Sequence, residues 1–233
     1  MGDVRPVIVV TGLDREARQV SGIGVRFVCG GGSAHALAAQ LSVLAGDAAG
    51  IISFGMAGAL DPGLNLGDWV IGSRLTGAIE GACDPAWVAA LARCLPRARV
   101  GTCFADGRMV STPGAKRDLA SRYHALAVDM ESHVAAAAAA KAQLPFAILR
   151  CVSDDAISAL PPAIGVSMAA GGGLALGAIL ASVVRQPGQI PALVRTTLGF
   201  ARAFATLGPT ARACGPRLAF DQRHTAAVVR ARR

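Results

Sequence analysis

The sequence predicts a layered α/β fold with a largely parallel sheet, and three observations support this prediction. Short apolar runs typical of strands alternate along the chain with segments of helical character. Glycine, proline or aspartate separates most of these segments. A length of 233 residues and a hydrophobic content of 53% suit one α/β domain with a sizeable core.

Each element has a local reason. Apolar runs predict strands at residues 6–10, 25–29, 51–54, 69–72, 100–104, 126–128 and 145–152. Helices are expected at 34–45, 84–95, 114–123, 134–143, 174–184 and 189–207, with a polar turn or short helix at 13–20. The helix at 134–143 is nearly all alanine, the best helix former, and Pro145 prevents its continuation. We expect one domain over residues 1–207 and a flexible basic tail at 208–233.

The centre of the chain is the stretch from Ala127 to Asp155, which is predicted to form a strand, a helix and a second strand. Asp129 and Glu131 follow the first strand, and Asp154 and Asp155 end the second. Ligands bind at the carboxyl ends of strands in open α/β sheets. We therefore expect this one unit to bring two acidic groups to the same crevice.

The net charge of +8 is concentrated at the C-terminal end. Residues 1–155 contain fourteen Lys and Arg and fourteen Asp and Glu, whereas residues 156–233 contain nine Arg and one acid, Asp221. Solvated helix faces, an anionic lipid surface or nucleic acid would each account for this excess. No aromatic residues are interleaved with the arginines to stack on bases, so we expect no nucleic-acid partner.

Two further features concern compartment and membrane. Residues 156–184 carry no charge, which permits a membrane span by length, but they include two prolines and several glycines, so a loop and a buried helix are favoured. The six cysteines form no CxxC pair and do not cluster with histidine. We therefore expect reduced thiols, no metal site, no signal peptide and a cytoplasmic location.

Two glycine-rich segments are candidates for ligand contact. Gly30–Ser33 precedes a predicted helix, an arrangement that exposes backbone N–H groups to anions, although no lysine follows as in a P-loop. Gly31, Gly32 and Ser33 are therefore candidate phosphate ligands. Gly55–Gly58 follows a strand, and its small residues allow a ligand to approach the backbone closely.

These segments resemble a known superfamily. SFGMAGAL at 53–60 with Gly67–Asp68, VDMES at 128–132 and VSD at 152–154 resemble, in order and spacing, motifs of the purine nucleoside phosphorylases and methylthioadenosine/S-adenosylhomocysteine nucleosidases. GLDREAR at 12–18, CGGGSAHA at 29–36, LPFAILR at 144–150 and RQPGQIPALVR at 185–195 resemble its hopanoid-associated phosphorylase branch. The resemblance implies a nucleoside phosphorylase-like three-layer sandwich, in which helices flank a twisted, mixed, largely parallel sheet.

The same resemblance implies an enzyme that cleaves a purine N-glycosidic bond. For this branch the substrate would be adenosylhopane, and the products adenine and ribosylhopane in hopanoid biosynthesis. An ordinary methylthioadenosine/S-adenosylhomocysteine nucleosidase or a purine nucleoside phosphorylase is the alternative within the class. A non-catalytic nucleotide- or lipid-binding protein on the same fold is the alternative outside it.

Cleavage of this bond requires an acid at the base, a ligand for the sugar hydroxyls and an activated nucleophile. By resemblance, Asp154 is the acid, oriented by Ser153, although a capping role is open and Asp155 is a rival. Glu131 would bind the ribose hydroxyls while Met130 packs on the sugar. Glu131 also suits the N-terminus of a helix, where the dipole favours a carboxylate.

Glu16 lies where the nucleosidases place the general base, although it could equally belong to an exposed charged turn. The resemblance places sugar and base against a backbone segment of small residues and against one aromatic side chain: Gly55, Met56, Ala57, Gly58 and Phe104. No organic cofactor is expected, and phosphate would be a co-substrate if the reaction is phosphorolytic.

Two departures from a related phosphorolytic branch concern the nucleophile. That branch has an arginine where this chain has Ser53, and a serine where it has Met56. Loss of a bidentate arginine weakens a phosphate site, so water is favoured over phosphate. Phosphate would need Arg18, Arg26 or Arg74 instead.

The expected partners are a small-molecule or lipid-linked adenosyl substrate and further copies of the chain in a homo-oligomer. If the substrate is a membrane lipid, the uncharged segment and the basic tail suggest peripheral contact with an anionic membrane, at the inner membrane surface.

Overall fold

The structure is a computed structural model that describes residues 5–20, 24–164, 182 and 184–220. Eight strands form one sheet in the described part of the chain: β1 (Val7–Thr11), β2 (Val25–Cys29), β3 (Gly50–Ala59), β4 (Trp69–Gly77), β5 (Gly81–Ala82), β6 (Arg99–Ala105), β7 (Ala125–Asp129) and β8 (Phe146–Asp154). The helices are α1 (Asp14–Ala17), α2 (Ala34–Leu44), α3 (Pro85–Cys94), α4 (Pro113–Tyr123), α5 (Ser132–Lys141) and α8 (Ile190–Ala213). Two short 3-10 helices lie at Ala45–Asp47 and Pro187–Gln189.

The sheet is mixed and largely parallel, as predicted. Its main path runs β2-β1-β3-β7-β6-β4-β5, and β8 pairs with both β3 and β4. The β3–β7, β4–β5 and β4–β8 pairs are antiparallel, and the other five pairs are parallel. β8 thus closes a ring with β3, β4, β6 and β7, and strands β3 and β8 form its most apolar part.

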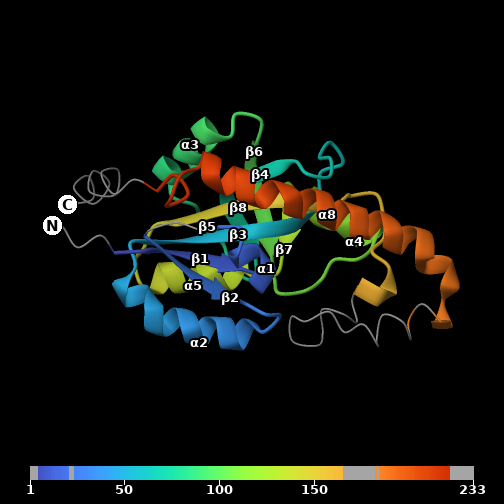
Figure 1. Cartoon of the computed structure of the whole chain (residues 1–233), viewed down its shortest axis with the longest axis horizontal. Coiled ribbons are helices and arrows are strands. Elements are labelled where there is room, and N and C mark those ends of the chain that lie inside the picture. The colour runs from blue at the N-terminus through green and yellow to red at the C-terminus, as the bar shows by residue number, and fades with distance from the viewer. Residues whose placement is uncertain (1–4, 21–23, 165–181, 183, 221–233) are drawn as a thin grey trace.

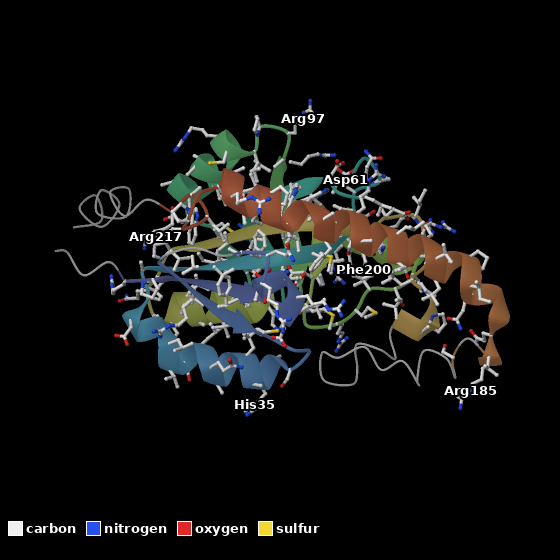
Figure 2. The ribbon with its side chains drawn as sticks, in the orientation of Figure 1. His35, Asp61, Arg97, Arg185, Phe200 and Arg217 are labelled. Carbon is white, nitrogen blue, oxygen red and sulfur yellow. The ribbon has the colours of Figure 1, made fainter. Side chains whose placement is uncertain are left out.

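Helices cover both faces of the sheet, which gives the expected three layers (Figure 1). Alternate residues of β1 show this directly: Ile8 and Val10 belong to the core on the side of α2 and α5, whereas Val7 and Val9 belong to the core under α3 and α8. Figure 2 shows the labelled His35 of α2 and Phe200 of α8 on these two sides. A smaller cluster around Phe104 packs α4 against β6 and β7.

Several elements are longer than the sequence predicts, and β4, expected at 69–72, continues to Gly77. β3 continues from Phe54 through the glycine-rich segment to Ala59, where its last residues pair with β7. α8 passes Gly208 and Pro209 and ends at Ala213, because Leu207, Ala211 and the following Cys214 and Leu218 are buried in the core. The packed chain therefore reaches Phe220, beyond the expected boundary at residue 207; residues 221–233 of the expected tail lie outside the described residues.

The helix expected at 174–184 lies almost wholly outside the described residues. Among the residues that the structure describes, no helix is both long and apolar enough to cross a membrane. All six cysteines are described, and each is a free thiol.

Candidate active site

The C-terminal half of β3 forms the floor of the candidate site, because two of its glycines leave room for carboxylates. A Cβ atom at Gly55 would lie 2.8 Å from Oε1 of Glu16, and a Cβ at Gly58 would lie 2.9 Å from Oδ2 of Asp154. Gly55 also has a φ of 144°, a conformation that side-chain-bearing residues rarely adopt. The small residues of this strand thus bring two acidic side chains against its backbone.

Glu16 reaches this strand from the short helix α1. Its side chain is buried, and its carboxylate accepts three backbone hydrogen bonds: Oε2 from the N–H groups of Gly12 and Leu13 at 2.9 and 3.0 Å, and Oε1 from Met56 at 2.9 Å. A carboxylate oxygen has roughly two acceptor positions, and Met56 occupies one of those on Oε1. Burial raises the pKa of Glu16, while nearby Arg150 and the backbone donors lower it.

Arg150, in the middle of β8, holds the surrounding acids together. Its guanidinium is fully buried and donates to Asp129 at 3.0 Å, lies 3.5 Å from Glu131 and donates to the backbone oxygen of Met56 at 3.3 Å. It also donates to the hydroxyl of Ser53 at 2.5 Å. Burial opposes its charge, but the attraction of Asp129, Glu131 and Glu16 raises the pKa of Arg150.

Asp129 fixes the backbone at the start of α5. Its carboxylate accepts hydrogen bonds from the N–H groups of Glu131 and Ser132 at 2.9 and 2.7 Å and from the Ser132 hydroxyl at 2.6 Å. Together with its ion pair to Arg150, these contacts engage both of its oxygens. Asp129 is therefore a structural acid that positions Glu131.

Glu131 lies between β1 and the loop after β2. A Cβ atom at Gly12 would be 3.0 Å from its Oε1, and a Cβ at Gly30 would be 3.2 Å from its Cγ. Burial and the charges of Asp129 and Glu16 raise the pKa of Glu131 to about 7, against the opposing effect of Arg150. Its side chain retains 14% exposure, so Glu131 can still contact a ligand.

Asp154 ends β8 and is held at both oxygens. The hydroxyl of Ser153 lies 3.1 Å from Oδ1 and 3.2 Å from the backbone oxygen of Ala57, and the ammonium of Lys116 lies 2.6 Å from Oδ2. A register shift between Ala57 and Gly58 sets Asp154 opposite Gly58 on β3. The Asp154 side chain is 12% exposed, whereas Lys116 is fully buried.

Glu16 and Asp154 therefore lie against the same strand, β3, and Glu131 lies beside Arg150 and near Glu16, although not for the reason expected. β7 and β8 were expected to be parallel neighbours with acids at one sheet edge. β3 instead lies between them, antiparallel to β7 and parallel to β8. Glu131 thus approaches from the end of β7 next to Glu16 and Arg150, and Asp154 approaches further along β3.

The glycine loop offers few free donors to an anion. The N–H groups of Gly30, Gly31 and Ser33 donate to backbone oxygens, and the Ser33 hydroxyl accepts from Ala36 at the start of α2. Gly32 and Ser33 are exposed.

Ser53, which stands where the phosphorolytic branch has an arginine, and Arg74, one of the alternative phosphate ligands, already have partners. Ser53 is buried against Arg150 and Ser132, and Arg74 pairs with Glu80 at 2.7 Å. Arg18 and Arg26 are exposed.

The remaining predicted contacts divide between the site and the core. Met130 is half-buried beside Glu131 in the sequence. Met56 packs against the core beneath α8, and Ala57 belongs to the opposite core. Phe104 is buried in the α4 cluster, with its ring centroid 5.1 Å from that of Tyr123.

Sequence reasoning missed Arg150 and Lys116. Arg150 carried a signal, because a charge in the centre of the apolar strand Phe146–Asp154 requires a buried partner. Lys116 belongs to the polar helix α4 and carried no such signal. In the described part of the chain, no group of three or more His, Cys, Asp or Glu side chains could hold a metal ion.

A mixed sheet between two helical layers, with acids against a glycine-rich central strand, defines an α/β enzyme of the nucleoside-cleaving class. The chain belongs to the phosphorylase superfamily, whose family model matches residues 1–163. This confirms the expected class, a nucleosidase or phosphorylase. A search among curated protein sequences found no significant match.

Solved structures of nucleosidases share the fold. An S-adenosylhomocysteine nucleosidase from Streptococcus pyogenes, in complex with 5-methylthiotubericidin, has a TM-score of 0.60 at 18% identity, covering 84% of this chain and 96% of that one. A 5'-methylthioadenosine/S-adenosylhomocysteine nucleosidase from Neisseria meningitidis has a TM-score of 0.63 at 16% identity, with 90% and 97% covered. A futalosine hydrolase from Helicobacter pylori has a TM-score of 0.58 at 17% identity, with 78% and 98% covered.

Proposed function

We propose that this protein hydrolyses the N-glycosidic bond of an adenosyl nucleoside, with water as the nucleophile. The observation that carries the proposal is the buried carboxylate of Glu16, which lies against Gly55 of β3 and accepts a hydrogen bond from Met56 on Oε1. Glu131 is its electrostatic neighbour, and Asp154 lies against the same strand. A candidate base and a candidate acid thus lie against β3, and the candidate sugar ligand lies near the base.

The three acids have separate roles. Glu16 accepts a proton from water as the oxygen attacks the anomeric carbon. Glu131 binds the ribose hydroxyls, and its place beside Arg150 and Asp129 fixes it before the sugar arrives. Asp154 delivers a proton to the departing purine, so that the electron pair of the broken bond leaves on a neutral base.

Water is favoured over phosphate because the cations near the site are already paired. Arg150 is committed to Asp129, Glu131 and Ser53, and Lys116 to Asp154. A phosphate would instead meet several carboxylates, and like charges at close range repel.

For the substrate, we propose adenosylhopane, with release of adenine and formation of ribosylhopane. The resemblance to the hopanoid-associated branch supports this choice, and the solved relatives whose names include adenosine or adenosylhomocysteine support an adenosyl group. Methylthioadenosine or S-adenosylhomocysteine is the alternative substrate.

A lipid-linked substrate suggests contact with an anionic membrane. Ile190, Val194 and Leu198 are 46%, 54% and 64% exposed and follow one another at four-residue spacing on α8. Residues 156–220 contain five arginines and no acid, and Figure 2 shows Arg185 projecting from the end of the molecule where α8 begins. Binding to phosphatidylglycerol vesicles at low salt, but not to neutral vesicles, is expected; no binding to either would contradict the contact.

The expected homo-oligomer remains a proposal, and the mass in solution by light scattering tests it. A monomer at micromolar concentration would contradict it.

The function itself is tested by following adenine release from adenosylhopane and from methylthioadenosine. We expect faster release from the lipid-linked nucleoside, and a loss of at least about 100-fold in kcat for Asp154→Asn and Glu16→Gln. Glu131→Gln should mainly raise KM. Full activity in all three variants would exclude this site, and no release from either nucleoside would exclude the function.

A further inference from the structure

Lys116 is the only residue of α4 that is buried, and it is fully buried. Lysine is among the residues least often found inside proteins, and a buried ammonium without a partner is strongly destabilising. Leu119, Ala120 and Tyr123 already pack α4 against the sheet, so packing of the helix does not require a lysine at this position. The burial of Lys116 therefore needs another explanation.

The position within the helix makes the placement less favourable still. α4 begins at Pro113 after its N-cap Thr112, so Lys116 lies in the first turn. The partial positive charge of a helix N-terminus disfavours a cation there. Lys116 is therefore present despite both burial and the helix dipole.

What offsets these costs is a pair of contacts at the end of β8. The ammonium donates to Oδ2 of Asp154 at 2.6 Å and to the backbone oxygen of Asp155. The carboxylate of Asp155 points to other groups, the N–H groups of Ile157 and Ser158 and the Ser158 hydroxyl. Arg117 and Asp118, the neighbours of Lys116 on α4, are exposed. Lys116 is thus the single charged group that faces Asp154 in the described part of the chain.

We propose that Lys116 is the proton source for the leaving base and acts through Asp154. The inference rests on the proposed function, in which Asp154 delivers a proton to the purine. A carboxylate paired with an ammonium has no proton of its own to give, and the nearest one is on Nζ of Lys116.

Oδ2 of Asp154 takes a proton from Nζ of Lys116 and passes it to the purine. As the glycosidic bond breaks, its electron pair goes to the purine, which leaves as a neutral base with this proton. Asp154 ends as a carboxylate and Lys116 as a neutral amine. The water that attacks the sugar gives its proton to Glu16. Lys116 regains a proton from solvent after adenine leaves.

Two substitutions separate this role from a structural one. Lys116→Met keeps the length of the side chain and removes the proton. Lys116→Arg keeps a cation beside Asp154, but a guanidinium does not release its proton in proteins. A structural or purely electrostatic role would therefore be restored by arginine, whereas proton donation would not. Arg117→Met is the matched control, since it removes an exposed cation from the same helix.

The measurement is kcat and KM for adenine release between pH 5 and 10, with melting temperatures for every variant. We expect kcat to fall at least about 100-fold in both Lys116 variants with KM changed less than about threefold.

Two results would overturn the inference while leaving the proposed function intact: full kcat in folded Lys116→Arg, or full kcat in folded Lys116→Met. If Lys116→Met does not fold, the kcat of Lys116→Arg alone distinguishes proton donation from a structural or electrostatic role. A wild-type protein that releases no adenine would overturn the inference and the proposed function together.

Discussion

Replacement of Gly58 by alanine tests whether Asp154 acts from its place against β3. A Cβ atom at Gly58 would lie 2.9 Å from Oδ2 of Asp154, well inside an ordinary contact of 3.4 Å or more. Gly58 is not among the glycines with positive φ, so its backbone accepts alanine without strain. The conflict is confined to a carboxylate that Lys116 and Ser153 hold from other directions.

The magnitude follows from the displacement that alanine imposes. The missing distance is about 0.5 Å, and a misplacement of 1 Å at a reacting group can cost about 100-fold in rate. We therefore expect kcat for adenine release to fall about tenfold. KM should change little, because Glu131 lies against Gly12 and Gly30 and not against Gly58. Crowding of this kind typically costs about 1–3 kcal/mol of stability.

The assay is steady-state adenine release by Gly58→Ala beside Gly46→Ala. A Cβ atom at Gly46 meets nothing within 4 Å, so the control adds the same methyl group without a conflict. An unchanged kcat in a folded Gly58→Ala protein would refute the placement of the acid. An equal loss of kcat in Gly46→Ala would show that the effect is general.

Further predictions concern charge and pH. The acidic limb of the pH profile of kcat/KM should lie above 4.5, the ordinary pKa of glutamate, because burial raises the pKa of Glu16 and only its carboxylate form accepts a proton; a limb at or below 4.5 would contradict this base. Replacing Arg150 by methionine should destabilise the protein by about 3–5 kcal/mol in urea unfolding, since Asp129 and Glu131 lose their buried partner; a loss below about 1 kcal/mol would argue against a central ion pair. Burial raises the pKa of Glu131 to about 7, so the folded state holds this proton more tightly than the unfolded state does. The wild type should therefore lose stability relative to Glu131→Gln as the pH rises from about 4.5 to about 7, and a constant difference over that range would contradict the shift.

Much of the fold follows from local patterns, and the exceptions have local causes. The strand at Val25–Cys29 has the bounds that the sequence predicts. Its apolar residues mark where the strand begins, and the glycine that follows marks where it ends. β3 is longer than predicted because its second half, Gly55–Ala59, consists mostly of small residues that carry no strand signal. α8 continues through Gly208 and Pro209 because burial of Leu207 and Ala211 outweighs the local preference to stop.

The pairing of strands was beyond the reach of these patterns. The sequence places β7 and β8 on either side of one helix, which usually makes them parallel neighbours. Insertion of β3 between them depends on contacts of Gly58 and Ala59 with residues some 70 positions away along the chain, and no local pattern encodes such contacts. Motifs in the sequence therefore identified the candidate acids, but they did not predict the strand pairing that determines how these acids are placed.

The same limit applies to the cations. Arg150 interrupts an apolar strand and could have been singled out as a buried charge in need of acids. Lys116 lies among polar residues in Pro113–Tyr123, and only the fold reveals that this one side chain points inward to Asp154.

The central claim is that buried Glu16 activates water at this site, and the dependence of adenine release on phosphate tests it most directly. With a saturating adenosyl substrate, adenine should appear at the same rate with and without phosphate, and ³¹P NMR should detect no sugar phosphate. Adenine release that requires phosphate and yields one sugar phosphate per adenine would contradict the claim.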